Sequence, residues 1–232
     1  MIASEPALGI PASPATPVVA LTGDFQFGRG QRIVQSQIQS RMMVWCKAGL
    51  GRVICNGQKI ALEPKDAVFL PWNRELIYEA DARTPFLVGG LHIIPHHDRA
   101  EPMRFYVPHA ARDLYTNCSF RQDRHLPGLE GILQARFMPA DPLELLAEYL
   151  VAKFRHASVG ATERVSSTQE LIDEAYALAP VFLSEAARCF CRTEGRVGGL
   201  ATPPGVLPSD LVRLLRFIDN HLSDPIGLCE LA

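Results

Sequence analysis

Short runs of alternating apolar and polar residues fill the chain from about Phe25 to His97 and predict a β-rich domain. Turn residues separate the runs, and one separator is Asn56-Gly57, which favours a two-residue hairpin because it accepts positive φ at both central positions. Seven short strands at this spacing are typical of a β-sandwich or a small barrel. The predicted strands are 32–37, 41–47, 51–56, 58–63, 66–71, 75–80 and 85–95.

A helical spacing of apolar residues begins after Asp141. Asp141 can cap a helix whose first residue is Pro142, a position where the missing N–H costs nothing. Such a stripe packs against a core or a partner helix, so we expect it to contribute to packing and to a homodimer contact. The stripe of this predicted helix, 141–156, consists of Leu143, Leu146, Leu150 and Phe154.

A second helix is predicted from the capping pattern Ser167-x-x-Glu170 to about Cys191. Pro180 lies within it and predicts a kink or a division, because proline removes a helical hydrogen bond. Between residues 102 and 132 the pattern is irregular and predicts no element.

Proline and glycine mark the boundaries of the remaining segments. Residues 1–20 are rich in Pro and Ala and predict a flexible arm, and 193–208 predict a linker. Ser209 can cap a last amphipathic helix. The predicted organisation is an arm (1–20), a β domain (21–135), a helical dimerisation region (136–192), a linker (193–208) and the beginning of another helical unit (209–232).

Composition narrows the classes of function. The net charge of −2 and the pI near 6.4 argue against a broad nucleic-acid-binding surface. No apolar run reaches the ~18 residues of a membrane span, and the amino terminus lacks the basic region of a signal peptide. We therefore expect a cytoplasmic protein. Its six cysteines form no CxxC pair and are expected to be reduced thiols.

The segment 209–232 resembles the beginning of the DNA-binding domain of AraC/XylS-type transcriptional regulators, with the pattern I-x-x-H-L-x-x-P-I-x-L-x-x-L-A. The matching residues are Ile218, His221, Leu222, Pro225, Ile226, Leu228, Leu231 and Ala232. The β-rich part resembles the cupin-like sensor domain of the same family, although Lys65 stands where the family has glycine. Its matching residues are Leu62, Pro64, Asp66, Leu70, Pro71 and Tyr78.

This resemblance implies an α+β fold: a cupin-like antiparallel β-barrel of the jelly-roll type, a helical dimerisation region, and the first helix of a truncated helix-turn-helix domain. It implies a non-enzymatic sensor that binds a small-molecule effector, such as a sugar or an aromatic acid, inside the barrel. Neither recognition helix of the family is in the sequence, so we expect DNA to be contacted only through the complete parent protein.

A metal-dependent cupin enzyme is the main alternative. The usual His-x-His pair is absent, and Leu76 stands where a metal cupin has histidine, so the standard site cannot form and no cofactor is expected. A non-standard ligand set would have to come from His92, His96, His97 and Asp98. The segment His96–Asp98 follows a proline and is expected to be an exposed loop. An orphan binding module without a role on DNA is a third alternative.

Several residues are candidates for contacting an effector. The resemblance places Tyr78 at a ligand-contacting position, and His92 lies on a predicted strand that can face the barrel interior or the core. Arg32 or Lys47 can complement an acidic effector. Trp45 and Trp72 are the large aromatic rings on or beside the strands. The pair Gly89-Gly90 predicts a close backbone approach or a bulge that leaves room for a ligand.

Overall fold

The structure is a computed structural model that describes residues 16–159 and 165–194. The predicted helical unit 209–232, most of the predicted linker and residues 1–15 lie outside the described residues. No helix within the described ranges is long and apolar enough to cross a membrane.

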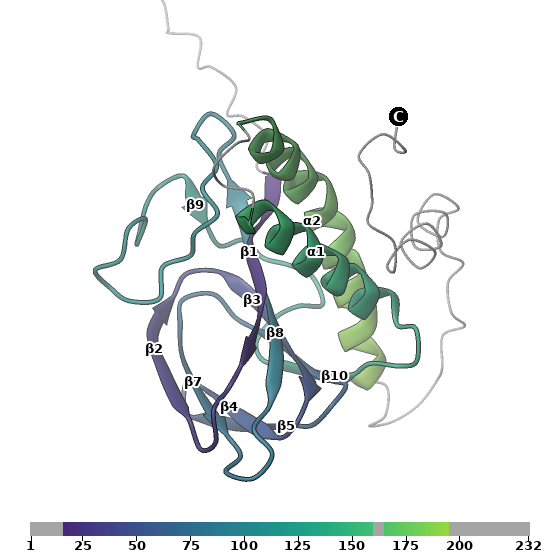
Figure 1. The fold of residues 1–232 in the computed structure, drawn as a ribbon. Helices are drawn as coiled ribbons and strands as arrows, with labels where there is room; N and C mark the ends of the chain where they lie inside the picture. The colour runs from purple at the N-terminus through teal and green to yellow at the C-terminus, as the bar shows by residue number, and fades with distance from the viewer. Residues whose placement is uncertain (1–15, 160–164, 195–232) are drawn as a thin grey trace, which may run out of the picture.

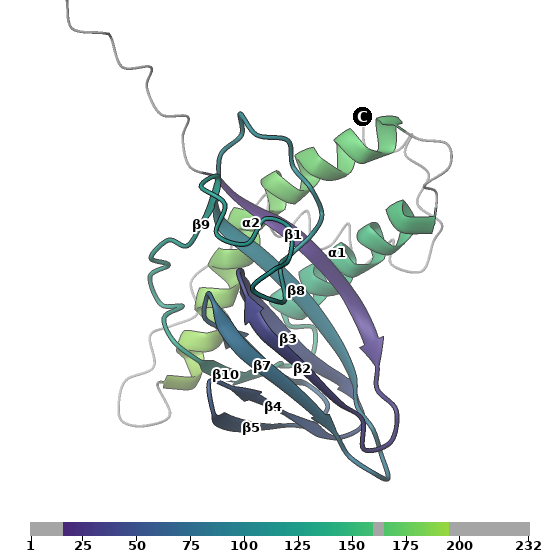
Figure 2. The same cartoon turned by 90° about the vertical axis from the view of Figure 1, so that its left-hand side faces the viewer.

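Two antiparallel sheets face each other, and two helices cover the outer face of the larger one (Figures 1 and 2). The larger sheet has the order β1 (Thr16–Gln26), β8 (Leu87–His97), β3 (Arg41–Ala48), β6 (Asp66–Leu70) and β10 (Leu133–Arg136), and β9 (Arg121–Gln122) pairs with β8. The smaller sheet has the order β2 (Arg32–Ile38), β7 (Arg74–Ala80), β4 (Gly51–Cys55) and β5 (Gln58–Leu62).

This arrangement is an antiparallel β-sandwich, one of the two forms that the strand spacing predicts, and it fits the cupin-like fold that the resemblance implies. The described residues do not show closure into a barrel. In the described residues the strand ladders stay within each sheet, and an isolated bridge between Leu50 and Pro85 connects the two. All seven predicted strands are present as β2 to β8. The hairpin is also confirmed, because Asn56 and Gly57 have φ of 47° and 84° between the paired residues Cys55 and Gln58.

Strand β1 shows that the predicted arm, residues 1–20, does not include residues 16–20. It begins at Thr16 and pairs with β8 from Thr16–His97 to Gln26–Leu87. Pro17 hid this strand from the sequence analysis, because proline is uncommon within strands. Proline can occupy this position because the register shifts between Thr16 and Val18. At such an irregularity the residue does not need to donate a backbone hydrogen bond to the neighbouring strand.

Helices α1 (Pro142–Val159) and α2 (Val165–Glu194) pack against the larger sheet. That sheet is therefore buried on both faces, which explains why six consecutive residues of β3, Arg41 to Cys46, are buried. Phe69 of β6 meets Phe190 of α2 with ring centroids 5.9 Å apart. Pro180 lies on the exposed side of α2, which continues through it and is not divided.

The segment from Asp98 to Ile132 is long and irregular apart from β9. It crosses one end of the sandwich, where β2 turns into β3 (Figure 1). The backbone N–H of Gln37 donates to the carbonyl of His109 over 3.2 Å, and the N–H of Asn117 donates to Oε1 of Gln39 over 2.7 Å. These bonds hold the covering segment, as we call residues 98–132, against the end of both sheets.

Candidate functional site

A cluster of polar side chains lies between the two sheets, among apolar residues, and all but the half-buried His109 are buried. Its members come from four parts of the fold: the β2–β3 turn, β7, β8 and the covering segment. Arg74 is 1% exposed, Ser40 0% and His92 5%. We call the following residues the interior cluster: Ser40, Arg74, Tyr78, His92 and His109.

Strand alternation places Arg74 and Tyr78 inside. Arg74, Leu76 and Tyr78 are alternate residues of β7 and are all buried. Of the residues on the other face, Glu75 is exposed and Ile77 is 9% exposed. Tyr78 is paired with Val53 of the neighbouring strand, also buried. The inner face of the smaller sheet thus presents a guanidinium and a phenol at two of its positions.

His92 approaches from the facing sheet. Its Nδ1 lies 2.8 Å from Oγ of Ser40, and its ring meets that of His109 edge to face, with centroids 5.6 Å apart. Its neighbour on β3 is Met42, whose sulfur accepts a 3.8 Å hydrogen bond from the Tyr78 hydroxyl. Met42 therefore links Tyr78 of one sheet to His92 of the other.

Arg74 is the charged member and is incompletely paired. Its Nη1 donates to the carbonyls of Ser40 (2.5 Å) and Pro71 (2.6 Å). Its Nε and Nη2 are buried without a hydrogen-bond partner among the described residues, and so is Oε1 of Gln35 on β2. Buried polar groups are normally hydrogen-bonded, so each of these atoms can bind a further group.

Burial sets the charges of the interior cluster. Burial lowers the pKa of Arg74 to about 10. Tyr78 and Cys55 raise this pKa and the charge of Arg41 lowers it, each by less than burial does. Burial, and then the charge of Arg74, lowers the pKa of His92 well below its usual value. Burial also lowers the pKa of His109. At neutral pH the interior cluster therefore carries one positive charge, on Arg74, beside neutral imidazoles.

Of the six predicted ligand-contacting residues, the structure brings Tyr78 and His92 together. Trp45 and Lys47 face the helices instead, because they occupy the alternate positions of β3. Nε1 of Trp45 donates to Glu148 of α1 over 2.8 Å. Nζ of Lys47 lies 2.6 Å from Glu148 and 3.0 Å from Asp24. Neither faces the interior cluster, and Trp72 is a half-buried residue packed against the core.

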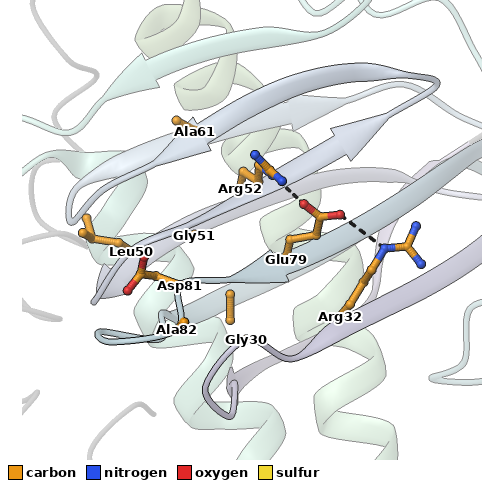
Figure 3. Close-up of a pocket in the computed structure, with 10 residues that line it drawn as sticks. Gly30, Arg32, Leu50, Gly51, Arg52, Ala61, Glu79, Asp81 and Ala82 are labelled. Carbon is orange, nitrogen blue, oxygen red and sulfur yellow. Dashed lines mark hydrogen bonds and ion pairs between the residues drawn. The ribbon is translucent and has the colours of Figure 1, made fainter.

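Arg32 is likewise outside the sandwich. It lies in an open hollow on the outer face of the smaller sheet, where Glu79 sits between it and Arg52 (Figure 3). Nε of Arg32 is 3.2 Å and Nε of Arg52 is 2.5 Å from the Glu79 carboxylate. The Arg32 and Arg52 side chains are about half exposed and share the one carboxylate of Glu79, and Asp81 adds a second negative charge to the lining of this hollow.

The histidine-rich segment differs from the predicted exposed loop. His97 ends β8 and is fully buried, with its Nδ1 2.7 Å from the Tyr176 hydroxyl of α2. His97 thus contacts the helices, whereas His92 faces the opposite sheet. In residues 16–159 and 165–194 no three His, Cys, Asp or Glu side chains are grouped to hold a metal ion.

The apolar stripe of α1 is buried within the chain itself. It packs on the larger sheet and α2, and this corrects its assignment as a dimer contact, because a second copy cannot reach these side chains. A homodimer stays a prediction, to be made through other residues. The stripe residues are Leu143, Leu146, Leu150 and Phe154, exposed by 0%, 1%, 1% and 5%.

Sequence reasoning missed Arg74, Ser40 and His109. The signal for Arg74 was present, because the alternation that puts Leu76 and Tyr78 inside also puts Arg74 inside. The close approach predicted at Gly89-Gly90 is confirmed at Gly89, where a Cβ would overlap the indole of Trp45, so the space beside Gly89 is filled by that ring.

Comparisons with known proteins assign no family. No family model and no curated protein matches the sequence. Solved structures similar to this chain include a cupin protein from Bacteroides fragilis (19% identity, 31% of this chain and 61% of that one, TM-score 0.27). They also include unsaturated fatty acid bound ToxT from Vibrio cholerae (12% identity, 76% of this chain and 55% of that one, TM-score 0.40).

Salicylate 1,2-dioxygenase from Pseudoaminobacter salicylatoxidans is a further similar structure (18% identity, 38% of this chain and 26% of that one, TM-score 0.28). This chain spans less than two thirds of each of the three. With identities below 25% and TM-scores below 0.5, these structures assign neither an activity nor a ligand to it.

Proposed function

We propose that this chain is the ligand-sensing and dimerisation portion of an AraC-type transcriptional regulator and not an enzyme. In this proposal a small-molecule effector binds between the two sheets, at the interior cluster. The observation that carries it is the set of unpaired polar atoms on Arg74 and Gln35, buried inside the sandwich. The sequence match from Ile218 to Ala232 supports the regulatory role.

Strand β3 offers a route from the effector to the helices. Met42, on its inner face, touches Tyr78, and Trp45 and Lys47, on its outer face, both bond to Glu148 of α1. An effector that moves Met42 would shift β3 and with it the position of α1. In a homodimer such a shift would change how two attached DNA-binding domains are presented to paired half-sites.

A thermal-shift screen of the purified chain against sugars and carboxylic acids tests the proposal. A ligand at 100 times its Kd stabilises the native state by about 2.7 kcal/mol, which for a chain of this size raises Tm by roughly 5–10 °C. We expect at least one compound to do so without being consumed. Turnover of a test compound, with iron, zinc or manganese bound stoichiometrically, would favour the metal-enzyme alternative instead.

A further inference from the structure

Arg74 has the surroundings of an arginine that binds a carboxylate. A buried charge is normally paired, since an unpaired one loses its hydration without compensation. The charged or titratable groups that act on Arg74 are Tyr78, Cys55 and Arg41, and no carboxylate is among them. The covering segment and both sheets therefore enclose a cation that lacks a counter-ion within the described residues.

Arg41 of the same chain provides an internal comparison. Its Nη1 donates to a backbone carbonyl, that of Leu129, over 3.3 Å. Its Nε and Nη2 form a bidentate pair with the Asp123 carboxylate, over 2.8 Å and 3.0 Å. Arg74 shares the first part of this pattern, because its Nη1 also donates to backbone carbonyls. It lacks the second part, because its Nε and Nη2 have no hydrogen-bond partner among the described residues.

The two carbonyl bonds fix the guanidinium, so that its free edge has a set direction. Nε–H and one N–H of Nη2 are parallel donors, which match the two oxygens of a carboxylate. Arg121 differs, because both of its Nη atoms donate to carbonyls, of Tyr106 and Arg104, and only its Nε is unpaired. It therefore has no free edge for bidentate binding.

Charge and shape limit the ligand further. His92 and His109 have lowered pKa values and stay neutral, so one negative charge balances the site. Besides the polar members of the interior cluster, the apolar side chains of Leu76 and Met42 are buried on the two inner faces. Met42 is unbranched, and beside it Gly90 has no side chain. Met42 can therefore move to make room for an apolar body.

Resting on the proposed function, we propose that the effector is a monocarboxylate with an apolar body, whose carboxylate binds Nε and Nη2 of Arg74. Its body lies between the sheets, against Met42 and Tyr78. A sugar, the other effector class considered, lacks the negative charge that this site accepts.

Calorimetric titration of the full chain tests this with matched probes. Benzoate and hexanoate are compared with benzamide and hexanamide, which keep the shape and lose the charge. We expect at least one acid to bind and its amide to bind about 30-fold more weakly or not at all, because truncating a buried charge pair costs at least that much. Arg74→Met should lose the acid, whereas Arg32→Met, on the outer face, should keep it.

Other outcomes separate the two proposals. If sugars or amides bind and His92→Gln abolishes their binding, the site is correct and the carboxylate assignment is wrong. If no probe binds the wild-type chain, or if the acids bind Arg74→Met as tightly as the wild type, the inference is overturned. If Arg74→Met does not fold, the affinities of the acids and their amides for the wild-type chain still show whether the site requires a negative charge.

Discussion

Replacing Gly89 by alanine should destabilise the protein through a single added methyl group. Gly89 lies on β8 beneath the indole of Trp45, and a Cβ built there would come within 2.7 Å of Trp45 Cη2 and nearer still to other ring atoms. The ring cannot retreat, since Trp45 is 1% exposed and its Nε1 is bonded to Glu148. Overpacking of this kind costs about 1–3 kcal/mol, and losing the hydrogen bond adds about 1 kcal/mol.

Two neighbouring glycines are matched controls for this substitution. A Cβ at Gly23 of β1 meets nothing within 4 Å, so Gly23→Ala should stabilise by about 0.5 kcal/mol through the entropy of the unfolded chain. Gly90→Ala meets the flexible end of Met42 at 3.1 Å and should fall between the two. Urea unfolding followed by circular dichroism measures all three. Equal stabilities of the Gly89 and Gly23 variants would refute the packing of Trp45 against the outer face of the larger sheet.

Two further predictions concern charged groups outside the interior cluster. Lys47→Met should destabilise the protein by about 1–3 kcal/mol, because the Glu148 carboxylate loses its cation and keeps the Trp45 hydrogen bond, whereas Asp24 stays paired with Arg155. Lys65→Met, which removes a more exposed pair, should cost less than ~1 kcal/mol in the same urea titration, and a comparable loss would contradict the assignment. For His97, burial lowers the pKa to about 4, so the unfolded state binds more protons and stability should fall as the pH drops from about 6.5 to about 4, by roughly 1 kcal/mol per unit. Because His97→Gln removes this group, the dependence of stability on pH should become shallower by the contribution of one proton, and an unchanged slope would refute the burial of His97 as a neutral group.

Local patterns in the sequence were sufficient for most elements of the fold. Strands β2 to β8 follow from alternation and turn residues, and the hairpin at Asn56-Gly57 follows from backbone sterics. Strand β1 could not be predicted this way, because its identity depends on pairing with β8, about 70 residues away, and Pro17 obscured it. Long-range pairing leaves no local signal.

The site was only partly predictable for a related reason. Alternation states that Trp45 and Met42 lie on different faces of β3, but both faces of the larger sheet are buried, and the sequence cannot tell which face meets the helices. The apolar stripe of α1, which includes Leu150, was ambiguous for the same reason. Its sequence pattern fits packing against a helix of a second copy as well as packing against the sheet of its own chain. Arg74 could have been found, since its inward position follows from Leu76 and Tyr78 on the same strand.

The central claim is that the effector binds at the interior cluster. The most direct test is the affinity of the strongest compound from the screen, measured by calorimetry for the wild type, His92→Gln and Arg32→Gln. The claim predicts that His92→Gln weakens binding at least about tenfold, by removing a buried polar contact, while Arg32→Gln, in the hollow on the outer face, leaves it unchanged. Unchanged binding to His92→Gln together with weakened binding to Arg32→Gln would place the ligand outside the sandwich and contradict the claim.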